Sequence, residues 1–326
     1  MTLSGLLRLP WVMRFRIVIA KFRRRYDPYY HWRLRRQRAL ELQLNLPYER
    51  GDVGLFYPEV LGIEETLCYI IEKKCSVSRF GDGEFALIDN RQMLFEQANS
   101  RLGQRLSEIL ARPIPQCLTC VLNVCGSLER YEEGDRIFWR QVLPWLRPVM
   151  ERTLKSYTQP LGDPQISRPY MTMVDKGMAM RVFDLWKVLF CGKRLLIVEG
   201  RFSRLGIGND LLSGATSIRR IWGPPKDAFA HYDEILSAVR STVEPGEMIV
   251  LAMGATATVL AYDLAKLGYW AIDVGHVDVE YMWMKMGTTH KVVIPGRYVS
   301  EVVGGQECAV ASDEEKKYNV VRTVGL

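Results

Sequence analysis

The chain has 326 residues and a formal net charge of +7, with 48 % hydrophobic and 25 % charged residues. This globular composition excludes a low-complexity chain, and the length predicts one enlarged α/β domain with an appendage. Residues 1–50 carry 12 Lys and Arg against three Asp and Glu, a local net charge of +9, whereas the remainder carries 32 against 34. The basic character therefore belongs to the N-terminal part.

Residues 1–54 are predicted to form a basic, amphipathic, helical extension. Its cationic side chains alternate with aromatic and aliphatic ones, as around Trp11, Phe15, Tyr29 and Trp32. This pattern is typical of a segment that lies on an anionic membrane surface, and we assign that role to residues 1–38. The alternative is a helix that packs on the body or on a second copy in a homodimer. Nucleic acid is not an expected partner, because no recognition motif accompanies the charge.

The sequence also predicts where the protein resides. No run of about 18 apolar residues is present, and Arg8, Arg14 and Arg16 interrupt any apolar core of a signal peptide. The seven cysteines are odd in number, and the pair Cys117-x-x-Cys120 lacks a second pair or a nearby histidine to complete a zinc site. We therefore expect free thiols in a cytoplasmic protein, peripheral on the inner face of a bacterial membrane.

A body domain is predicted over residues 55–303, beginning with less regular elements. Pro144 and Pro148 fall inside one predicted helix and are expected to kink or divide it. The apolar spacing predicts helices over 63–73, 102–110 and 137–152, strands over 75–79 and 118–124, and a turn over 81–83 followed by ordered chain over 84–88.

The second half is more regular, with strands that alternate with helices. We expect helices over 176–190, 229–239 and 255–267, strands over 195–198, 217–222, 248–252 and 270–274, and a loop over 200–208 that leads into a further element over 209–212. Such alternation gives crossover connections and a mostly parallel, Rossmann-like sheet flanked by helices. The tail, residues 304–326, is polar and is predicted to pack poorly.

A candidate metal site follows the strand at 75–79, in the segment Arg79-Phe80-Gly81-Asp82-Gly83-Glu84. Glycines let the chain bend, so that two carboxylates two residues apart can turn toward one point. Mn²⁺ or Mg²⁺ takes one or two carboxylates together with phosphate oxygens. We predict that Asp82 and Glu84 hold this metal. The alternative is an ordinary Gly-Asp-Gly turn with a solvated glutamate.

Two further segments lie where predicted strands end. Ser203, Arg204, Gly206, Gly208, Asn209 and Asp210 follow the strand at 195–198, and Gly254 and Thr256 follow the strand at 248–252. Ligands of open α/β sheets bind at this edge, where glycines and helix N-termini admit phosphate. The alternatives are a structural turn at 200–208 and a helix cap at Thr256.

A polar cluster, Asp273-Val274-Gly275-His276-Val277-Asp278-Val279-Glu280, ends the last predicted strand. If the chain stays extended, alternation places His276, Asp278 and Glu280 on one side. These side chains are candidates for a general base, a metal ligand or partners of sugar hydroxyls. A purely structural cluster is the alternative.

Taken together, these motifs resemble the bacterial GT-D-type glycosyltransferases, a family first known as a domain of unknown function. The resemblance covers about residues 60–300 and includes Ser167-Arg168-Pro169-Tyr170 and Ala228-Phe229 besides the segments above. It implies a Rossmann-like fold of its own topology and an Asp-x-Glu metal motif, which matches Asp82 and Glu84. It also implies a UDP-sugar donor and a glycan acceptor in glycoprotein or cell-envelope polysaccharide synthesis.

The resemblance leads to a prediction for each group of residues. Arg79, Phe80 and Gly81 join the residues at 203–210 and 254–256 as the predicted donor-binding set, and the base is expected among His276, Asp278 and Glu280. The basic extension suits a lipid-linked oligosaccharide acceptor. The rival interpretations are another Rossmann-type nucleotide-dependent enzyme, disfavoured by the incomplete glycine fingerprint, and a non-catalytic scaffold of polysaccharide assembly, disfavoured by the intact acidic motif.

Overall fold

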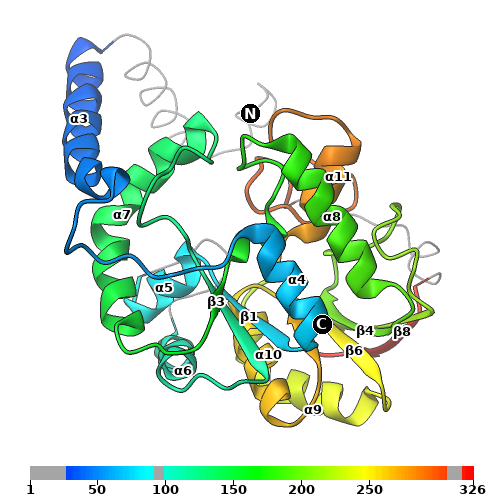
Figure 1. Ribbon diagram of the computed structural model, residues 1–326. Helices are drawn as coiled ribbons and strands as arrows, with labels where there is room; N and C mark the ends of the chain where they lie inside the picture. Colours follow the sequence, from blue (N-terminus) through cyan, green and yellow to red (C-terminus); the bar gives the residue numbers. More distant parts are fainter. Residues whose placement is uncertain (1–26, 92–98, 307–317) are drawn as a thin grey trace.

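The computed structural model describes residues 27–91, 99–306 and 318–326. Its helices and strands alternate over most of this length (Figure 1). The elements are α3 (Pro28–Arg50), α4 (Ile63–Lys73), β1 (Ser76–Phe80), α5 (Asp82–Ile88), α6 (Ser100–Ala111), β2 (Cys117–Val121), α7 (Glu133–Leu154), β3 (Leu161–Gly162), η1 (Pro164–Ser167), α8 (Lys176–Phe190), β4 (Arg194–Gly200), β5 (Ser217–Gly223), η2 (Ala228–His231), α9 (Tyr232–Thr242), β6 (Glu247–Ala252), α10 (Ala255–Lys266), β7 (Ala271–Asp273), α11 (Val277–Lys285) and β8 (Val320–Thr323).

The strands of the described residues form one parallel sheet in the order β3-β2-β1-β7-β6-β4-β5-β8. Strands β1, β2 and β3 follow one another toward one edge of the sheet, and β4, β5 and β8 follow one another toward the other edge. Strands β7 and β6 lie between β1 and β4. Right-handed crossovers then place helices on both faces. Helix α10 covers β1 and β7 on one face and contacts α6 and α9, while α4 and α8 pack together on the other (Figure 1). The predicted Rossmann-like parallel sheet is confirmed.

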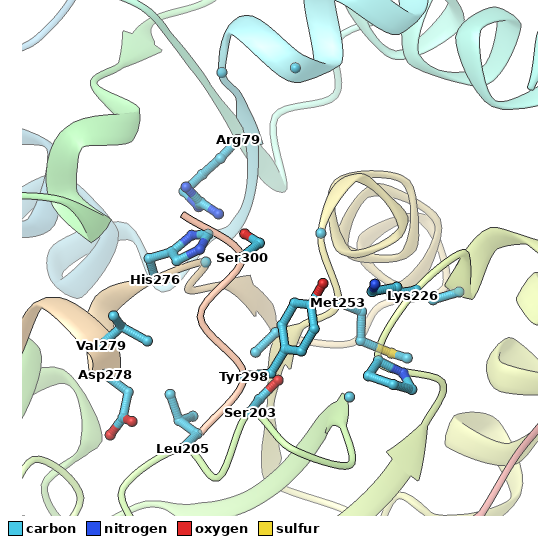
Figure 2. A pocket seen from close by; sticks show the side chains of 18 of the residues that line it. Arg79, Ser203, Leu205, Lys226, Met253, His276, Asp278, Val279, Tyr298 and Ser300 are labelled. Atoms are coloured by element: carbon cyan, nitrogen blue, oxygen red, sulfur yellow. The ribbon is translucent and has the colours of Figure 1, made fainter. Parts of the chain in front are cut away.

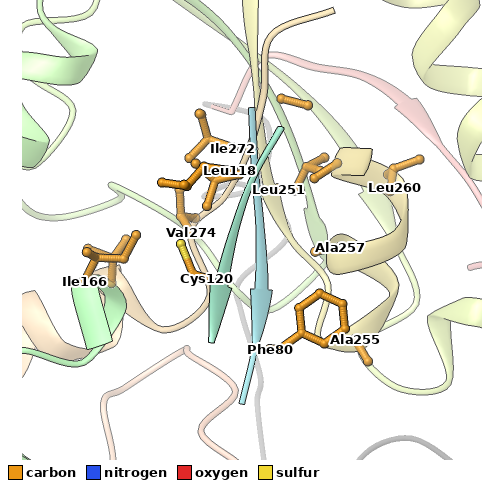
Figure 3. Packing of buried hydrophobic residues seen from close by; sticks show 14 of the residues in the cluster. Phe80, Leu118, Cys120, Ile166, Leu251, Ala255, Ala257, Leu260, Ile272 and Val274 are labelled. Atoms are coloured by element: carbon orange, nitrogen blue, oxygen red, sulfur yellow. The ribbon is translucent and has the colours of Figure 1, made fainter. Parts of the chain in front are cut away.

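The core covers both faces of the sheet. The inner strand β4 is apolar over Leu195–Val198 and buried on both faces, as expected for a parallel strand covered by helices. On one face Phe80 and Leu251 pack beside Ala257 and Leu260 of α10, and on the other Ile272 lies beside Leu118 and Val274 (Figure 3). This packing fixes the carboxyl ends of β1, β6 and β7 relative to one another.

Three sequence predictions differ from the structure. Helix α7 runs through Pro144 and Pro148 without a break. No helix follows β4, because residues 201–216 form turns that lead directly into β5. Residues 307–317 of the predicted tail lie outside the described residues, but its end packs on the body, since β8 pairs with β5 and Val324 is buried.

The N-terminal extension is partly described. Its residues 1–26, including Trp11 and Phe15, lie outside the described residues. The helix predicted for the remainder is α3, capped by Asp27, whose carboxylate accepts hydrogen bonds from the backbone N–H groups of Tyr29 and Tyr30. No helix in the described part of the chain combines the length and the apolar character needed to cross a bilayer.

Candidate functional site

A cavity of about 230 Å³ opens at the carboxyl edge of the sheet. It lies over the ends of the central strands, where the strand order reverses direction and where α/β sheets bind ligands. Figure 2 shows side chains from separate segments that surround it. The lining residues discussed below are Arg79, Gly81, Asp82, Glu84, Arg168, Ser203, Lys226, Met253, Gly254, Gly275, His276, Asp278, Tyr298 and Ser300.

Asp82 and Glu84 lie in the first turn of α5, which begins one residue after β1. The Glu84 Oε2 accepts a hydrogen bond of 2.8 Å from the Gly81 N–H and so caps the helix. Burial raises the pKa of Glu84 to about 7. Burial also raises the pKa of Asp82, against the opposing effect of the Arg168 guanidinium. Both carboxylates therefore lie where a cation would stabilise their charged form.

The donor set fits a divalent metal only in part. Within residues 27–91, 99–306 and 318–326, no group of three or more His, Cys, Asp or Glu side chains is arranged to hold an ion. Asp82 and Glu84 nevertheless border one cavity with room beside them, and Mg²⁺ or Mn²⁺ completes its coordination with water and phosphate oxygens. The two carboxylates are thus suited to a metal that arrives together with a phosphate ligand.

Arg79 is fixed at the floor of the cavity by Asp273 and Ser167. Its Nη2 donates to the Asp273 Oδ1 at 2.8 Å, its Nε to the Asp273 carbonyl oxygen at 3.0 Å, and its Nη1 to the Ser167 Oγ at 2.8 Å. Gly275 permits this arrangement, because a Cβ there would lie 2.0 Å from the Arg79 Nη2 and its φ is +48°. The guanidinium is therefore held beside the acidic motif.

A second charged cluster joins Arg168, His276, Glu301 and Lys291. The Arg168 Nη2 donates to the His276 Nδ1 at 3.0 Å and also pairs with Glu301, whose other oxygen accepts from the Lys291 Nζ at 2.5 Å. Burial alone would raise the pKa of Glu301, but Arg168 and His276 hold it below its usual range. Because an arginine only donates, the neutral His276 ring keeps its hydrogen on Nε2.

The surroundings of His276 predict how stability depends on pH. Burial, followed by the positive charge of Arg168, lowers the pKa of His276 from 6.5 to about 3. Between these values the unfolded chain binds a proton at this ring and the folded chain does not. The contribution of the neutral ring to stability is therefore complete above about pH 6.5 and is lost as the pH falls toward about 3.

We expect His276→Gln to flatten this part of the stability profile. The free energy of unfolding in urea would be measured for both proteins at several pH values between about 4 and 7. His290→Gln is the matched control, because this side chain is exposed. Parallel profiles for His276→Gln and the unmodified protein would contradict the burial of an uncharged His276.

Asp278 forms a buried ion pair with Arg297 on the other side of the cavity. The Arg297 Nε donates to the Asp278 Oδ2 at 2.6 Å, and both side chains are 4 % exposed. The Asp278 Oδ1 accepts from the Gly206 N–H at 2.8 Å and from the Asn209 Nδ2 at 2.7 Å. The carboxylate thereby ties the β4–β5 loop to the segment that carries Tyr298 and Ser300.

Glu280 is fully buried beneath the cavity and does not line it. Its Oε2 accepts hydrogen bonds from the Tyr170 N–H at 3.0 Å and the Met171 N–H at 2.8 Å, which fixes the segment that follows Arg168. The expectation that His276, Asp278 and Glu280 share one side of an extended chain is wrong, because α11 begins at Val277. Their side chains leave a helix start in different directions and serve different loops.

The predicted donor-binding residues divide into two groups. Arg79, Gly81, Ser203 and Gly254 line the cavity. The residues outside its lining are Phe80, Arg204, Gly206, Gly208, Asn209, Asp210 and Thr256. Phe80 belongs to the core, and Asp210 pairs with Lys187 at 2.8 Å and accepts from the Tyr281 hydroxyl. Since no helix follows Gly208, this loop offers no helix N-terminus to a phosphate.

The lining residues that were not predicted as site residues include Arg168, Lys226, Tyr298 and Ser300. Arg168 occurs in the Ser167-Arg168-Pro169-Tyr170 motif, which was a usable signal. Lys226 follows Pro224-Pro225 after β5, at the strand edge where ligands were expected. Tyr298 and Ser300 come from an irregular segment far along the chain, and no pattern in the sequence connects them with the cavity.

A parallel α/β sheet with a polar cavity at its carboxyl edge defines a class of enzymes that bind nucleotides and related ligands. The family model of the glycosyltransferase GT-D fold matches residues 77–302 of this chain. The chain therefore belongs to the GT-D glycosyltransferase family. The family expected from the sequence motifs is confirmed.

Curated relatives and solved structures agree with this family. A probable glycosyl transferase Gly of Streptococcus gordonii is 37 % identical, and a glycosyltransferase GlyD of Streptococcus pneumoniae is 33 % identical, each over 82 % of this chain. The match spans 40 % and 32 % of those two proteins, so this chain corresponds to less than half of their length.

The solved structures cover a larger share. A domain of unknown function 1792 with a distinct glycosyltransferase fold is 38 % identical, with a TM-score of 0.75 over 82 % of this chain and 96 % of that chain. A glycosyltransferase of the same domain type from Streptococcus sanguinis is 35 % identical, with a TM-score of 0.74 over 82 % and 99 %.

Proposed function

We propose that the chain transfers a hexose from a UDP-sugar to a hydroxyl group of an oligosaccharide acceptor, in cell-envelope polysaccharide or glycoprotein glycan synthesis. The observation that carries this proposal is the cavity itself, where the Asp82 and Glu84 carboxylates face the cationic side chains of Arg79, Arg168 and Lys226. A nucleoside diphosphate with its metal needs both kinds of group in one place.

In this proposal Asp82 and Glu84 hold Mn²⁺ or Mg²⁺. The bound ion would supply Lewis-acid stabilisation of the diphosphate that leaves. Arg79 and Arg168, beside the two carboxylates, orient the phosphates and add fixed positive charge. The acceptor oxygen forms a bond to the anomeric carbon, the bond from that carbon to the diphosphate breaks, and the hydroxyl proton leaves with a base.

The predicted base residues receive a revised role in this proposal. Asp278 and Glu280 accept hydrogen bonds from the loops around them, and the His276 Nδ1 accepts from Arg168. We assign all three to positioning, because both Asp278 oxygens and the His276 Nδ1 already accept hydrogen bonds, and Glu280 is buried outside the cavity lining. The neutral His276 ring then carries its hydrogen on Nε2, which lies 3.7 Å from the Glu301 Oε1, and offers no free site for a proton.

The acceptor in this proposal is an oligosaccharide linked to a lipid. The basic extension of residues 1–38 would bind the anionic inner face of the bacterial membrane and keep the enzyme near such an acceptor. A homodimer through α3 is the alternative use of the same surface.

Calorimetric titration with UDP tests the proposed donor. We expect binding in the presence of Mn²⁺ and at least about tenfold weaker binding after the metal is removed with a chelator, because two buried carboxylates would then face the diphosphate without a cation. A panel of UDP-sugars then ranks the sugar. Equal affinity with and without Mn²⁺, or no affinity for any uridine nucleotide, would contradict the proposal.

A further inference from the structure

The N-terminal half of α3 presents an exposed cationic and aromatic surface. Tyr29 is 68 % exposed and Trp32 is 48 % exposed, although both are large and partly apolar. Their rings stack with centroids 5.9 Å apart, and the Arg36 guanidinium lies 5.3 Å from the centroid of the Trp32 ring. We call this the α3 surface, and it consists of Tyr29, Trp32, Arg33, Arg35, Arg36 and Arg38.

The charges of the α3 surface are not neutralised within the described protein. Its four arginines are exposed, and none forms an ion pair with another residue of 27–91, 99–306 or 318–326. The acidic residues of the helix are used elsewhere: Glu41 accepts from the Gln37 side chain, and Glu49 pairs with Arg140. The surface is therefore complementary to a dense array of negative charge.

The other half of α3 is attached firmly to the body. The Arg140 side chain makes two hydrogen bonds to the Glu49 carboxylate, and the Asn45 Nδ2 donates to the Arg140 carbonyl oxygen at 3.0 Å. The Arg147 guanidinium stacks 3.7 Å from the centroid of the Tyr48 ring. Because these contacts with α7 hold one end of the helix, its N-terminal half has a defined direction.

That direction is toward the side on which the cavity opens. Helix α7 begins at Glu133, after the carboxyl end of β2, and it holds α3 near Arg140. From Asn45 to Tyr29 the helix rises about 24 Å, whereas α7 extends only about 10 Å from Arg140 back to Glu133. The α3 surface thus projects beyond the start of α7, and Figure 1 shows α3 standing clear of the sheet.

We propose that the α3 surface docks on an anionic lipid bilayer with the carboxyl edge of the sheet facing the membrane. Aromatic rings enter the headgroup region and arginines meet lipid phosphates, and the N-terminal half of α3 carries both kinds of side chain around its circumference. The cavity is then held toward an acceptor carried on a lipid. This last step rests on the proposed function, whereas membrane docking does not.

Vesicle binding by the full chain tests the docking. We expect binding to vesicles that contain phosphatidylglycerol and little binding to phosphatidylcholine alone. The variant Arg33→Glu/Arg35→Glu/Arg38→Glu should weaken binding by about 100-fold, because each basic residue near an anionic surface contributes severalfold. The matched control is Arg112→Glu/Lys155→Glu/Arg240→Glu, which makes the same change of charge at exposed residues away from α3.

Three results would overturn the docking. One is equal loss in both triple variants, which would indicate only general charge attraction. The second is vesicle binding that does not depend on phosphatidylglycerol, and the third is a dimer in solution that the α3 variant dissociates. UDP titration of the same proteins separates the docking proposal from the proposed donor. The α3 variant should bind UDP as the unmodified chain does. If the chain binds vesicles but no uridine nucleotide, only the proposed UDP-sugar donor is refuted.

Energy transfer to labelled lipid tests the orientation. A fluorophore would be placed at Glu133 or at Lys155, which mark the two ends of α7 about 33 Å apart, after the exposed Cys68 and Cys191 are replaced by Ser. We expect greater transfer from position 133. Equal transfer, or greater transfer from position 155, would overturn the proposed orientation.

Discussion

Asp82→Asn and Glu84→Gln are each expected to weaken Mn²⁺-dependent binding of UDP and to lower transfer activity by about 10²–10³-fold. Each change removes one of the two carboxylates of the Asp82-Gly83-Glu84 motif, both of which border the cavity. A loss of this size is typical when a single group that stabilises developing charge is removed. Calorimetry would measure the affinity, and steady-state hydrolysis of the UDP-sugar would measure the activity.

The control for Glu84 is Glu65→Gln. Glu65 caps α4 through the Gly62 N–H at 2.7 Å, in the same way that Glu84 caps α5, but it lies outside the lining of the cavity. Glu65→Gln should therefore reproduce any effect of the weakened cap on stability and leave UDP binding as it is. Unaltered Mn²⁺-dependent affinity in both site variants would show that the metal is held elsewhere.

Asp278→Ala is expected to lower the free energy of unfolding by about 3–5 kcal/mol. The change leaves the buried Arg297 guanidinium without its partner, and an uncompensated buried charge is costly. It also removes the acceptor for the Gly206 N–H and the Asn209 side chain. Unfolding in urea, at a pH where the unmodified protein is stable, would measure the difference.

The double variant Asp278→Leu/Arg297→Met distinguishes a structural ion pair from a catalytic base. Removing both charges should recover much of the lost stability, because apolar side chains then replace a pair whose desolvation is expensive. Stability that is unchanged in Asp278→Ala, together with a loss of transfer, would restore Asp278 as the base.

The sequence predicts regular elements well where local pattern and tertiary environment agree. Helix α8 spans Lys176–Phe190 as predicted, because its apolar stripe packs on the core and Asp175 caps its start. Strand β4 extends the predicted apolar run by a residue or two at each end. The position of Asp82 and Glu84 beside a cavity could be predicted for a similar reason, since a strand end, a glycine turn and two acidic residues are adjacent in the chain.

Predictions failed where distant residues decide the conformation. The stretch after Gly208 lacks the expected helix because Asp278 and Arg297 hold the loop by its backbone groups, including a 2.8 Å hydrogen bond from the Gly206 N–H. His276 to Glu280 coil into α11 because the chain must leave the sheet after β7. Arg168 and Tyr298 reach the cavity from irregular segments. The course of these segments depends on tertiary contacts, which the periodicity of the local sequence does not predict.

The strand β8 has a consequence for where this chain can be shortened. The family match ends at residue 302, yet the backbone of β8 and its neighbours covers the outer side of β5: the Arg220 N–H donates to the Asn319 carbonyl oxygen, and the Val324 N–H donates to the Trp222 carbonyl oxygen. A chain cut at residue 302 would expose these groups as an open template for strands of other molecules. Self-association through β5 would then limit its solubility, even though every residue that lines the cavity is still present.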